Sequence, residues 1–332
     1  MKKIGTIFLA MMMILFLLPV LVTWTLKPEE SQLEELLVEP IYTGNNIKVQ
    51  KKETGEIITL DFEEYIKGVV AAEMPANFEE EALKAQAVAA RTYALRRILE
   101  RDNQPLETRP PYHITTDFRT GQSYLNMQEL KERWGETNFY TYYEKVAKAV
   151  IATQGEIMVY EEEPIEAVFH STSAGMTQSA KDLWTMDLPY LQSVDSIKDV
   201  QAPSFLQQME FTVEEFLEKV VEAIPEIVIG KEDVTKQMQI IERNPAGYVK
   251  QVQIGNQILT GQDLRGILGL ASNHFTIEET EQTISFLTQG YGHGVGMSQY
   301  GAHYMAQEGK DYREILQHYY QGIQIEKMQK YE

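Results

Sequence analysis

The chain has 332 residues, of which 43% are hydrophobic and 24% charged, the composition of a globular protein with one large domain or two. Its formal net charge of −19 argues against nucleic acid as a partner and against adhesion to an anionic lipid surface, since both attract Lys and Arg. The absence of cysteine excludes disulfides, thiolate metal sites and a cysteine nucleophile.

The N-terminus predicts a membrane anchor. Lys2 and Lys3 precede an uncharged stretch, residues 4–26, that is long enough to cross a bilayer as a helix. Because this stretch ends without a small-residue cleavage site, we favour an uncleaved anchor over a cleaved signal peptide. Residues 1–3 then form a cytoplasmic tip and residues 27–46 an acidic stalk, and the rest of the chain lies outside the cytoplasm.

The remaining sequence predicts an α+β fold over residues 47–322, with a tail at 323–332. Capping residues and apolar periodicity predict helices at 62–72, 78–101, 142–152, 213–223 and 298–308, and a last helix opened by Asp311 and Glu314. Strands are expected at 57–60, 156–160, 165–170, 239–241 and 248–254. The strands at 156–160 and 165–170 should pair as a hairpin, and residues 204–288 should form a smaller α+β unit.

Glu73 is a lone carboxylate in the apolar run from Val69 to Pro75. Burial disfavours the charged form, so such a Glu can remain protonated near neutral pH and act as a general acid. Pro75 prevents the helix from continuing, so Glu73 lies at the helix C-terminus, where the negative end of the dipole raises its pKa further. The alternative is a Glu at a helix end with its carboxylate in water.

Two later segments gather small and polar residues. One follows a predicted strand as Ser171-Thr172-Ser173-Ala174-Gly175, and the other, Gly290–Gly296, has four glycines in seven residues, which allows close backbone approach to a ligand. The glycines lack the Gly-Lys-Ser/Thr ending of a phosphate loop, and neither serine has the Gly-x-Ser-x-Gly setting of a hydrolase. His293 and His303 do not form a zinc motif, so we expect no metal and no cofactor.

The catalytic chemistry should need only one carboxylate. A two-carboxylate glycosidase requires a second acid near Glu73, and no other acid lies in a comparable motif. A non-hydrolytic glycan lyase meets this condition, because the substrate's own 6-hydroxyl is the nucleophile and one Glu serves as acid and then as base.

Three segments resemble the stage II sporulation protein D (SpoIID) family of membrane-anchored lytic transglycosylases. They are Val70–Pro75 with Glu81–Tyr93, then Phe169–Thr177, and then Gly292–Gly301. The resemblance implies that Glu73 is the acid and base. It also implies that the polar positions of a glycan cleft are Gln86, Arg91, Ser171, Ser173, Thr177, His293 and Gln299.

The resemblance further implies a task, which is cutting the MurNAc–GlcNAc bonds of peptide-stripped peptidoglycan strands to 1,6-anhydro ends during engulfment. The implied partners are the stage II sporulation proteins P, an amidase, and M, a membrane protein. Some family members carry cysteines and a metal in the loop after the long helix, but this loop, His113–Tyr124, offers only His113, so no metal is implied for this chain. The rival hypothesis is a non-catalytic peptidoglycan-binding scaffold of the engulfment complex.

Overall fold

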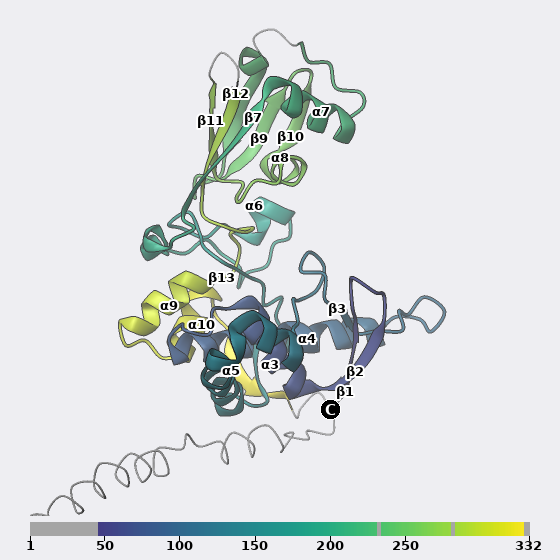
Figure 1. The fold of residues 1–332 in the computed structure, drawn as a ribbon, viewed down its shortest axis with the longest axis vertical. Helices are drawn as coiled ribbons and strands as arrows, with labels where there is room; N and C mark the ends of the chain where they lie inside the picture. The colour runs from purple at the N-terminus through teal and green to yellow at the C-terminus, as the bar shows by residue number, and fades with distance from the viewer. Residues whose placement is uncertain (1–45, 231–233, 280–282, 329–332) are drawn as a thin grey trace, which may run out of the picture. The chain divides into compact units, whose positions relative to one another are not determined.

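The computed structural model describes residues 46–230, 234–279 and 283–328, which form a mixture of helices and several small sheets (Figure 1). This confirms the α+β class predicted from the sequence. The expected membrane anchor at 4–26 and almost all of the stalk lie outside the described residues. Among the helices that the structure describes, none is long and apolar enough to cross a membrane.

The helices carry the labels of Figure 1. They are α3 (Phe62–Glu73), α4 (Glu80–Asp102), α5 (Met127–Ala152), α6 (Ala180–Trp184), α7 (Val213–Ala223), α8 (Gly261–Leu268), α9 (Gln299–Gln307) and α10 (Tyr312–Tyr319). Two 3₁₀ helices cover Ile197–Gln201 and Val234–Gln237.

The strands form small separate sheets. One sheet has the order β2-β1-β3, with β1 (Asn46–Gln50), β2 (Ile57–Asp61) and β3 (Ile114–Thr115). Another has the order β14-β4-β5, with β4 (Glu156–Tyr160), β5 (Glu163–Pro164) and β14 (Gln324–Lys327), and a third pairs β6 (Phe169–His170) with β13 (Met297–Ser298). The other two are β11-β12-β7 and β10-β9-β8, from β7 (Leu206–Thr212), β8 (Met238–Arg243), β9 (Val249–Ile254), β10 (Gln257–Thr260), β11 (Phe275–Glu279) and β12 (Thr283–Gln289).

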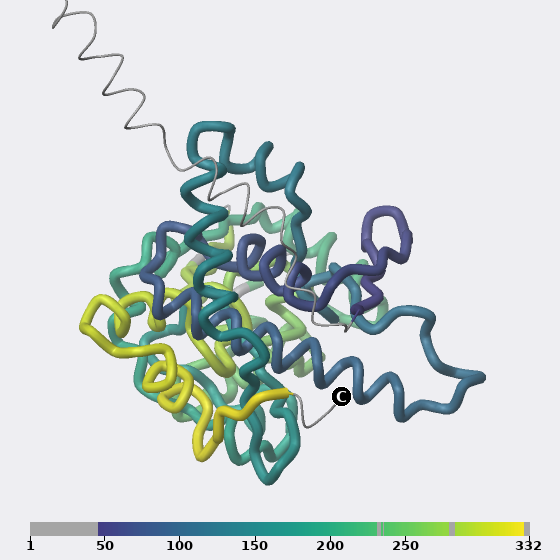
Figure 2. The backbone as a smooth tube through the Cα atoms, turned by 90° about the horizontal axis from the view of Figure 1, so that it is seen from below, coloured from purple at the N-terminus to yellow at the C-terminus, as the bar shows by residue number. Residues whose placement is uncertain are grey.

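Helix α4 is the central element of a helical layer, against which helices from both ends of the described chain pack. It contacts α3, α5, α9, α10 and β4, and Figures 1 and 2 both show α4 beside α5. The reason lies in its small side chains, which let neighbouring backbones approach closely. These fully buried alanines are Ala82, Ala85, Ala87, Ala89, Ala90 and Ala94.

Two predicted helix boundaries were wrong. The second helix begins at Glu80 instead of Phe78, because the Phe78 ring packs against Tyr300 and His303, at centroid distances of 4.9 and 4.3 Å. The third helix begins at Met127, fifteen positions before the predicted start, with Asn126 as its cap and a kink at Gly135 (φ 71°). The first half of this helix is rich in polar and aromatic residues, so its sequence lacks the apolar periodicity from which a helix is predicted.

The predicted hairpin between 156–160 and 165–170 was also wrong. Strand β4 pairs with Glu163–Pro164, and the chain at 165–168 is not a strand. Strand β6 instead pairs in parallel with β13, from the glycine-rich segment near the C-terminus. This long-range pairing brings two of the sequence motifs together.

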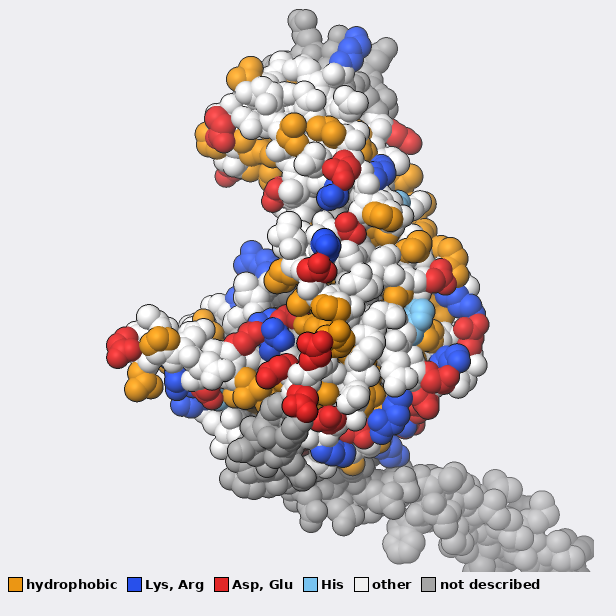
Figure 3. Space-filling model, turned by 180° about the vertical axis from the view of Figure 1, so that it is seen from behind, with side chains coloured by type: hydrophobic (Ala, Val, Ile, Leu, Met, Phe, Trp, Pro, Cys, Tyr) orange, Lys and Arg blue, Asp and Glu red, His pale blue; other side chains and the backbone are white. Residues whose placement is uncertain are grey.

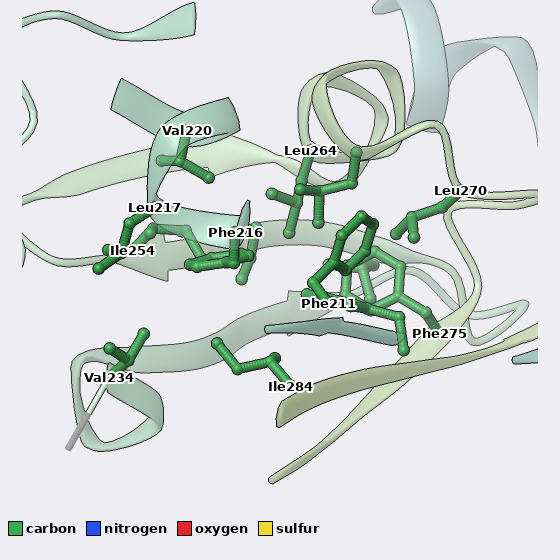
Figure 4. Close-up of a cluster of buried hydrophobic side chains, with 14 of the residues drawn as sticks. Phe211, Phe216, Leu217, Val220, Val234, Ile254, Leu264, Leu270, Phe275 and Ile284 are labelled. Carbon is green, nitrogen blue, oxygen red and sulfur yellow. The ribbon is translucent and has the colours of Figure 1, made fainter. Parts of the chain in front are cut away.

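The two sheets between residues 206 and 289 share one hydrophobic cluster with α7 and α8 (Figure 4). Phe211, Phe216, Leu264, Phe275 and Phe286 lie in it. Val249, Val252 and Ile254 of β9 and the one apolar face of α7 supply inward side chains. On the face seen in Figure 3, acidic and basic side chains are interspersed over the described surface, with no continuous basic area on that face.

Candidate functional site

Glu73 is the last residue of α3. Pro75 restricts the residue before it, and Met74 is extended (φ −119°, ψ 139°), so the helix ends there. The side chain of Glu73 is only partly buried, so part of it remains in contact with solvent. The free carbonyls of the last turn are capped from α5, where Arg133 Nη1 donates to Ala72 O at 2.9 Å and to Ala71 O at 3.4 Å.

The carboxyl group of Glu73 lies in a site that favours its protonated form. Loss of contact with water raises its pKa above the ordinary Glu value, while hydrogen bonds from Ser123 and the charge of Arg133 act in the opposite direction. The backbone N–H of Ser123 donates to Oε1 at 2.6 Å. Glu73 therefore combines a fixed position with a raised pKa, as a general acid requires.

Buried contacts hold the loop that carries Ser123. Tyr65 Oη donates to Gln122 Oε1 at 3.2 Å, and Gln122 Nε2 donates to Ala90 O at 3.3 Å. The Tyr124 ring stacks on Tyr65 with a centroid distance of 5.6 Å and covers Gly68, where any Cβ would collide with that ring. The Tyr65 side chain of α3 and a backbone carbonyl of α4 thus fix the loop on both sides of Ser123.

The two segments of small and polar residues, Ser171–Gly175 and Gly290–Gly296, pack together in a second cluster, apart from the surroundings of Glu73. Strands β6 and β13 pair Phe169 with Met297 and His170 with Ser298, and Tyr300 N donates to Ser171 O at 3.1 Å. The glycines permit this packing, since a Cβ at Gly290 would come within 2.7 Å of Thr172 O. The glycines therefore allow segments of the chain to pack closely against one another.

Ser173 and Thr177 have internal partners and are fully buried. Gly175 N donates to Ser173 Oγ at 3.1 Å, and Val194 N donates to Thr177 Oγ1 at 2.9 Å. Ser173 N donates to Asp199 Oδ2 at 2.7 Å. These hydroxyls hold the loop in place, whereas Ser171 is partly exposed.

His293 is partly exposed, but both of its ring nitrogens have partners. Nδ1 accepts from Val295 N at 3.2 Å, so Nε2 carries the proton and donates to Phe169 O at 3.0 Å. Burial, with a smaller effect of Arg265, lowers the pKa of His293 to about 4, so the ring is neutral at pH 7. Within the described ranges no three His, Asp or Glu side chains lie close enough together to hold a metal ion.

Gln86 and Gln299 connect the helix that follows Glu73 with the cluster formed by Ser171–Gly175 and Gly290–Gly296. Gln299 Nε2, in the first turn of α9, donates to Gln86 Oε1 of α4 at 3.3 Å. Gln86 is fully buried, and its Nε2 has no hydrogen-bond partner among the described residues. This contact fixes the glycine-rich segment against the helix that follows Glu73.

Arg91 lies in the interior. Its Nε and Nη2 donate to the two carboxylate oxygens of Glu63 at 2.8 and 2.7 Å, and Nη1 donates to Glu156 O at 3.0 Å. Both side chains are almost fully inaccessible. The pair ties α4 to the first turn of α3, so Arg91 supports the helix that carries Glu73 and offers no free group to a ligand.

The sequence reasoning missed Ser123 and Arg133. Ser123 acts through its backbone N–H and its hydroxyl on a partner fifty positions away, so no sequence signal marks it. Arg133 lies in the half of α5 that was not predicted. Two surface hollows, of about 400 and 570 Å³, are lined by other residues, around Arg96 and Tyr160 and around Ile224 and Leu259, and do not include Glu73.

Comparisons with known proteins agree with the resemblance seen in the sequence. A family model described as stage II sporulation protein matches residues 50–160, which include Glu73, Ser123 and Arg133. The chain is 40% identical to the stage II sporulation protein D of Bacillus subtilis, over 90% of this chain and 83% of that protein. It is also 40% identical to the protein of that name from Bacillus amyloliquefaciens, over 90% and 82% of the two chains. An amidase enhancer of Bacillus subtilis is 26% identical over 78% of this chain and 40% of that protein.

Proposed function

The chain belongs to the stage II sporulation protein D family, and on that premise we propose that it is a lytic transglycosylase acting in sporulation. Its substrate would be the MurNAc–GlcNAc bond of peptide-stripped peptidoglycan strands. The observation that carries the proposal is Glu73, a partly exposed carboxyl with a raised pKa and a fixed position. Among the described residues, the groups that shift the pKa of Glu73 include no second carboxylate, and we assign both proton transfers to Glu73.

The reaction begins when Glu73 donates its proton to the glycosidic oxygen and the bond between that oxygen and C1 of the muramic sugar breaks. The 6-hydroxyl of the same sugar then forms the new bond to C1. Its proton passes to the carboxylate of Glu73, which regains its starting form. The product is a 1,6-anhydro end and no water is added, so one acid–base group is enough.

The residues that the resemblance assigns to the cleft differ in how far they are exposed to solvent. Ser171 and His293 are partly exposed, and we propose that they contact the sugar, His293 through the carbon atoms of its ring, since both ring nitrogens have partners. We propose that the buried residues act by holding these loops and helices in position. These are Gln86, Arg91, Ser173, Thr177 and Gln299.

The proposal includes a place of action. An anchor at residues 4–26 would hold the enzyme at the membrane with its catalytic part outside the cytoplasm, where peptidoglycan lies. Its partners in engulfment would be the stage II proteins P and M. The likeness to an amidase enhancer supports a link to an amidase, because removal of the stem peptides must precede cleavage of stripped strands.

The test is digestion of purified peptide-free strands with the wild type and with Glu73→Gln, which keeps the shape of the side chain. We expect the wild type to release ends lighter than hydrolysed ends by one water, and Glu73→Gln to lose roughly 10²- to 10⁴-fold in rate while still binding strands. Glu218→Gln is the matched control, since Glu218 is an exposed carboxylate of α7.

Three results would contradict the proposal in different ways. Near-normal cleavage by Glu73→Gln would remove Glu73 from the reaction. A majority of reducing ends would indicate a hydrolase with a second carboxylate. Strand binding without any product from the wild type would favour the peptidoglycan-binding scaffold.

A further inference from the structure

Arg133 is held beside Glu73 by the end of α3. Its Nη1 donates to Ala72 O at 2.9 Å and to Ala71 O at 3.4 Å, the carbonyls just before the carboxylate. The helix segment that carries it is itself fixed, because Asn126 caps its start and Trp134 packs on Phe139 and Tyr142. The guanidinium is thus anchored next to Glu73, and its charge acts on that carboxyl.

Two nitrogens of the Arg133 guanidinium remain available as hydrogen-bond donors. Nη1 is occupied, but Nε and Nη2 have no hydrogen-bond partner, and no Asp or Glu forms an ion pair with Arg133, within the part of the chain that the structure describes. The side chain is exposed. Other arginines in this acidic chain have carboxylate partners, such as Arg91 with Glu63 and Arg119 with Asp117. Nε and Nη2 form the edge of the guanidinium that binds a carboxylate with two parallel hydrogen bonds.

The proposed substrate has an acceptor that fits this edge. The muramic sugar carries a lactyl group on the oxygen of C3, two carbons from the C1 atom at which the bond breaks. When a stem peptide is attached, the lactyl carbonyl is an amide. When the peptide is removed, the same position is a free carboxylate.

We propose that Arg133 binds the free lactyl carboxylate of the muramic sugar next to the scissile bond and so makes the enzyme selective for peptide-stripped strands. This inference rests on the proposed function, because it needs a muramic sugar at Glu73. An amide at this position removes the charge and one of the two acceptor oxygens. A charge-assisted hydrogen bond is then lost, which corresponds to roughly a tenfold loss of affinity or rate.

The experiment compares two strand preparations of equal length, one with free lactyl carboxylates and one with the same carboxylates converted to N-methylamides. Cleavage rates are measured for the wild type, Arg133→Gln and Arg133→Lys, and binding is measured with Glu73→Gln and with the Glu73→Gln/Arg133→Gln double variant. Lys131→Gln is the matched control, since it removes a positive charge from the same helix, where Nζ of Lys131 lies 5.2 Å from the centre of the Phe139 ring.

We expect the wild type and Lys131→Gln to prefer the carboxylate strands by roughly tenfold, and Arg133→Gln to treat both preparations alike. Arg133→Lys should keep part of the preference, because it retains the charge but not the paired donors. Any effect of Arg133 on the pKa of Glu73 is common to both strands and cancels in the ratio. Equal rates for the wild type, or a preference that survives in Arg133→Gln, would overturn the proposal.

The binding measurements separate this proposal from the proposed function. If the wild type cleaves neither preparation, the transglycosylase assignment fails. Binding then decides the role of Arg133. A carboxylate preference that is present in Glu73→Gln and lost in the double variant supports the role, and equal binding by Glu73→Gln rejects it.

Discussion

Ser123 donates its backbone N–H to Oε1 of Glu73 at 2.6 Å, although the two residues lie fifty positions apart in the sequence. This bond fixes the carboxyl group without removing it from its partly exposed position. It also favours the ionised form, in opposition to the burial that raises the pKa of Glu73. A loop residue therefore moderates the proton affinity of the proposed acid against the larger effect of burial.

Ser123→Ala should move the pH dependence of cleavage. The Ser123 hydroxyl also lowers the pKa of Glu73, so its loss should raise that pKa further above the ordinary Glu value. An acid must be protonated, so activity falls as the pH rises through this pKa, and the falling limb should shift to higher pH. Initial rates across a pH series measure the shift, Ser123→Thr should stay close to wild type, and an unmoved limb in Ser123→Ala would contradict the role.

Gly301→Ala should destabilise the fold. Gly301 lies in the first turn of α9, and a Cβ there would collide with Tyr319 Oη, which is itself hydrogen-bonded to Ser196 Oγ at 2.8 Å. Overpacking of this kind typically costs about 1–3 kcal/mol in the free energy of unfolding, which urea titration would measure. Gly266→Ala is the control, since Gly266 of α8 has no neighbour within 4 Å of a built Cβ and alanine there should stabilise by roughly 0.5–1 kcal/mol. Equal effects of the two substitutions would show that the packing at Gly301 is looser than described.

Arg91→Met should lower stability far more than loss of a surface ion pair. It would leave the carboxylate of Glu63 buried without its partner, which typically costs about 3–5 kcal/mol. The double variant Glu63→Leu/Arg91→Met should recover much of that loss, because no buried charge is then unpaired. Lys310→Met, at an exposed pair with Glu314, should change the free energy of unfolding far less than Arg91→Met. A double variant no more stable than Arg91→Met would contradict this account.

The sequence by itself identified the features that depend on neighbours along the chain. Pro75 predicted the end of the helix at Glu73, and the capping pairs Thr212 with Glu215 and Asp311 with Glu314 predicted helix starts that the structure confirms. These features are local because a cap or a proline acts on backbone groups within one turn.

Only the tertiary structure decided which polar residues face inward and which chain segments meet. Arg91 and Ser173 have the residue types of a binding cleft, but both are buried against partners distant in the sequence, Glu63 and Asp199. The glycines of 290–296 suggested approach to a ligand, and the structure uses them for close packing within the chain, against residues 168–173 and the Tyr248 ring. Residue type reports the capacity to form a hydrogen bond but not the location of the partner. That location is fixed by the packing of α5 against α3 and of the loop before α5 against Tyr65, which brings Arg133 and Ser123 to Glu73.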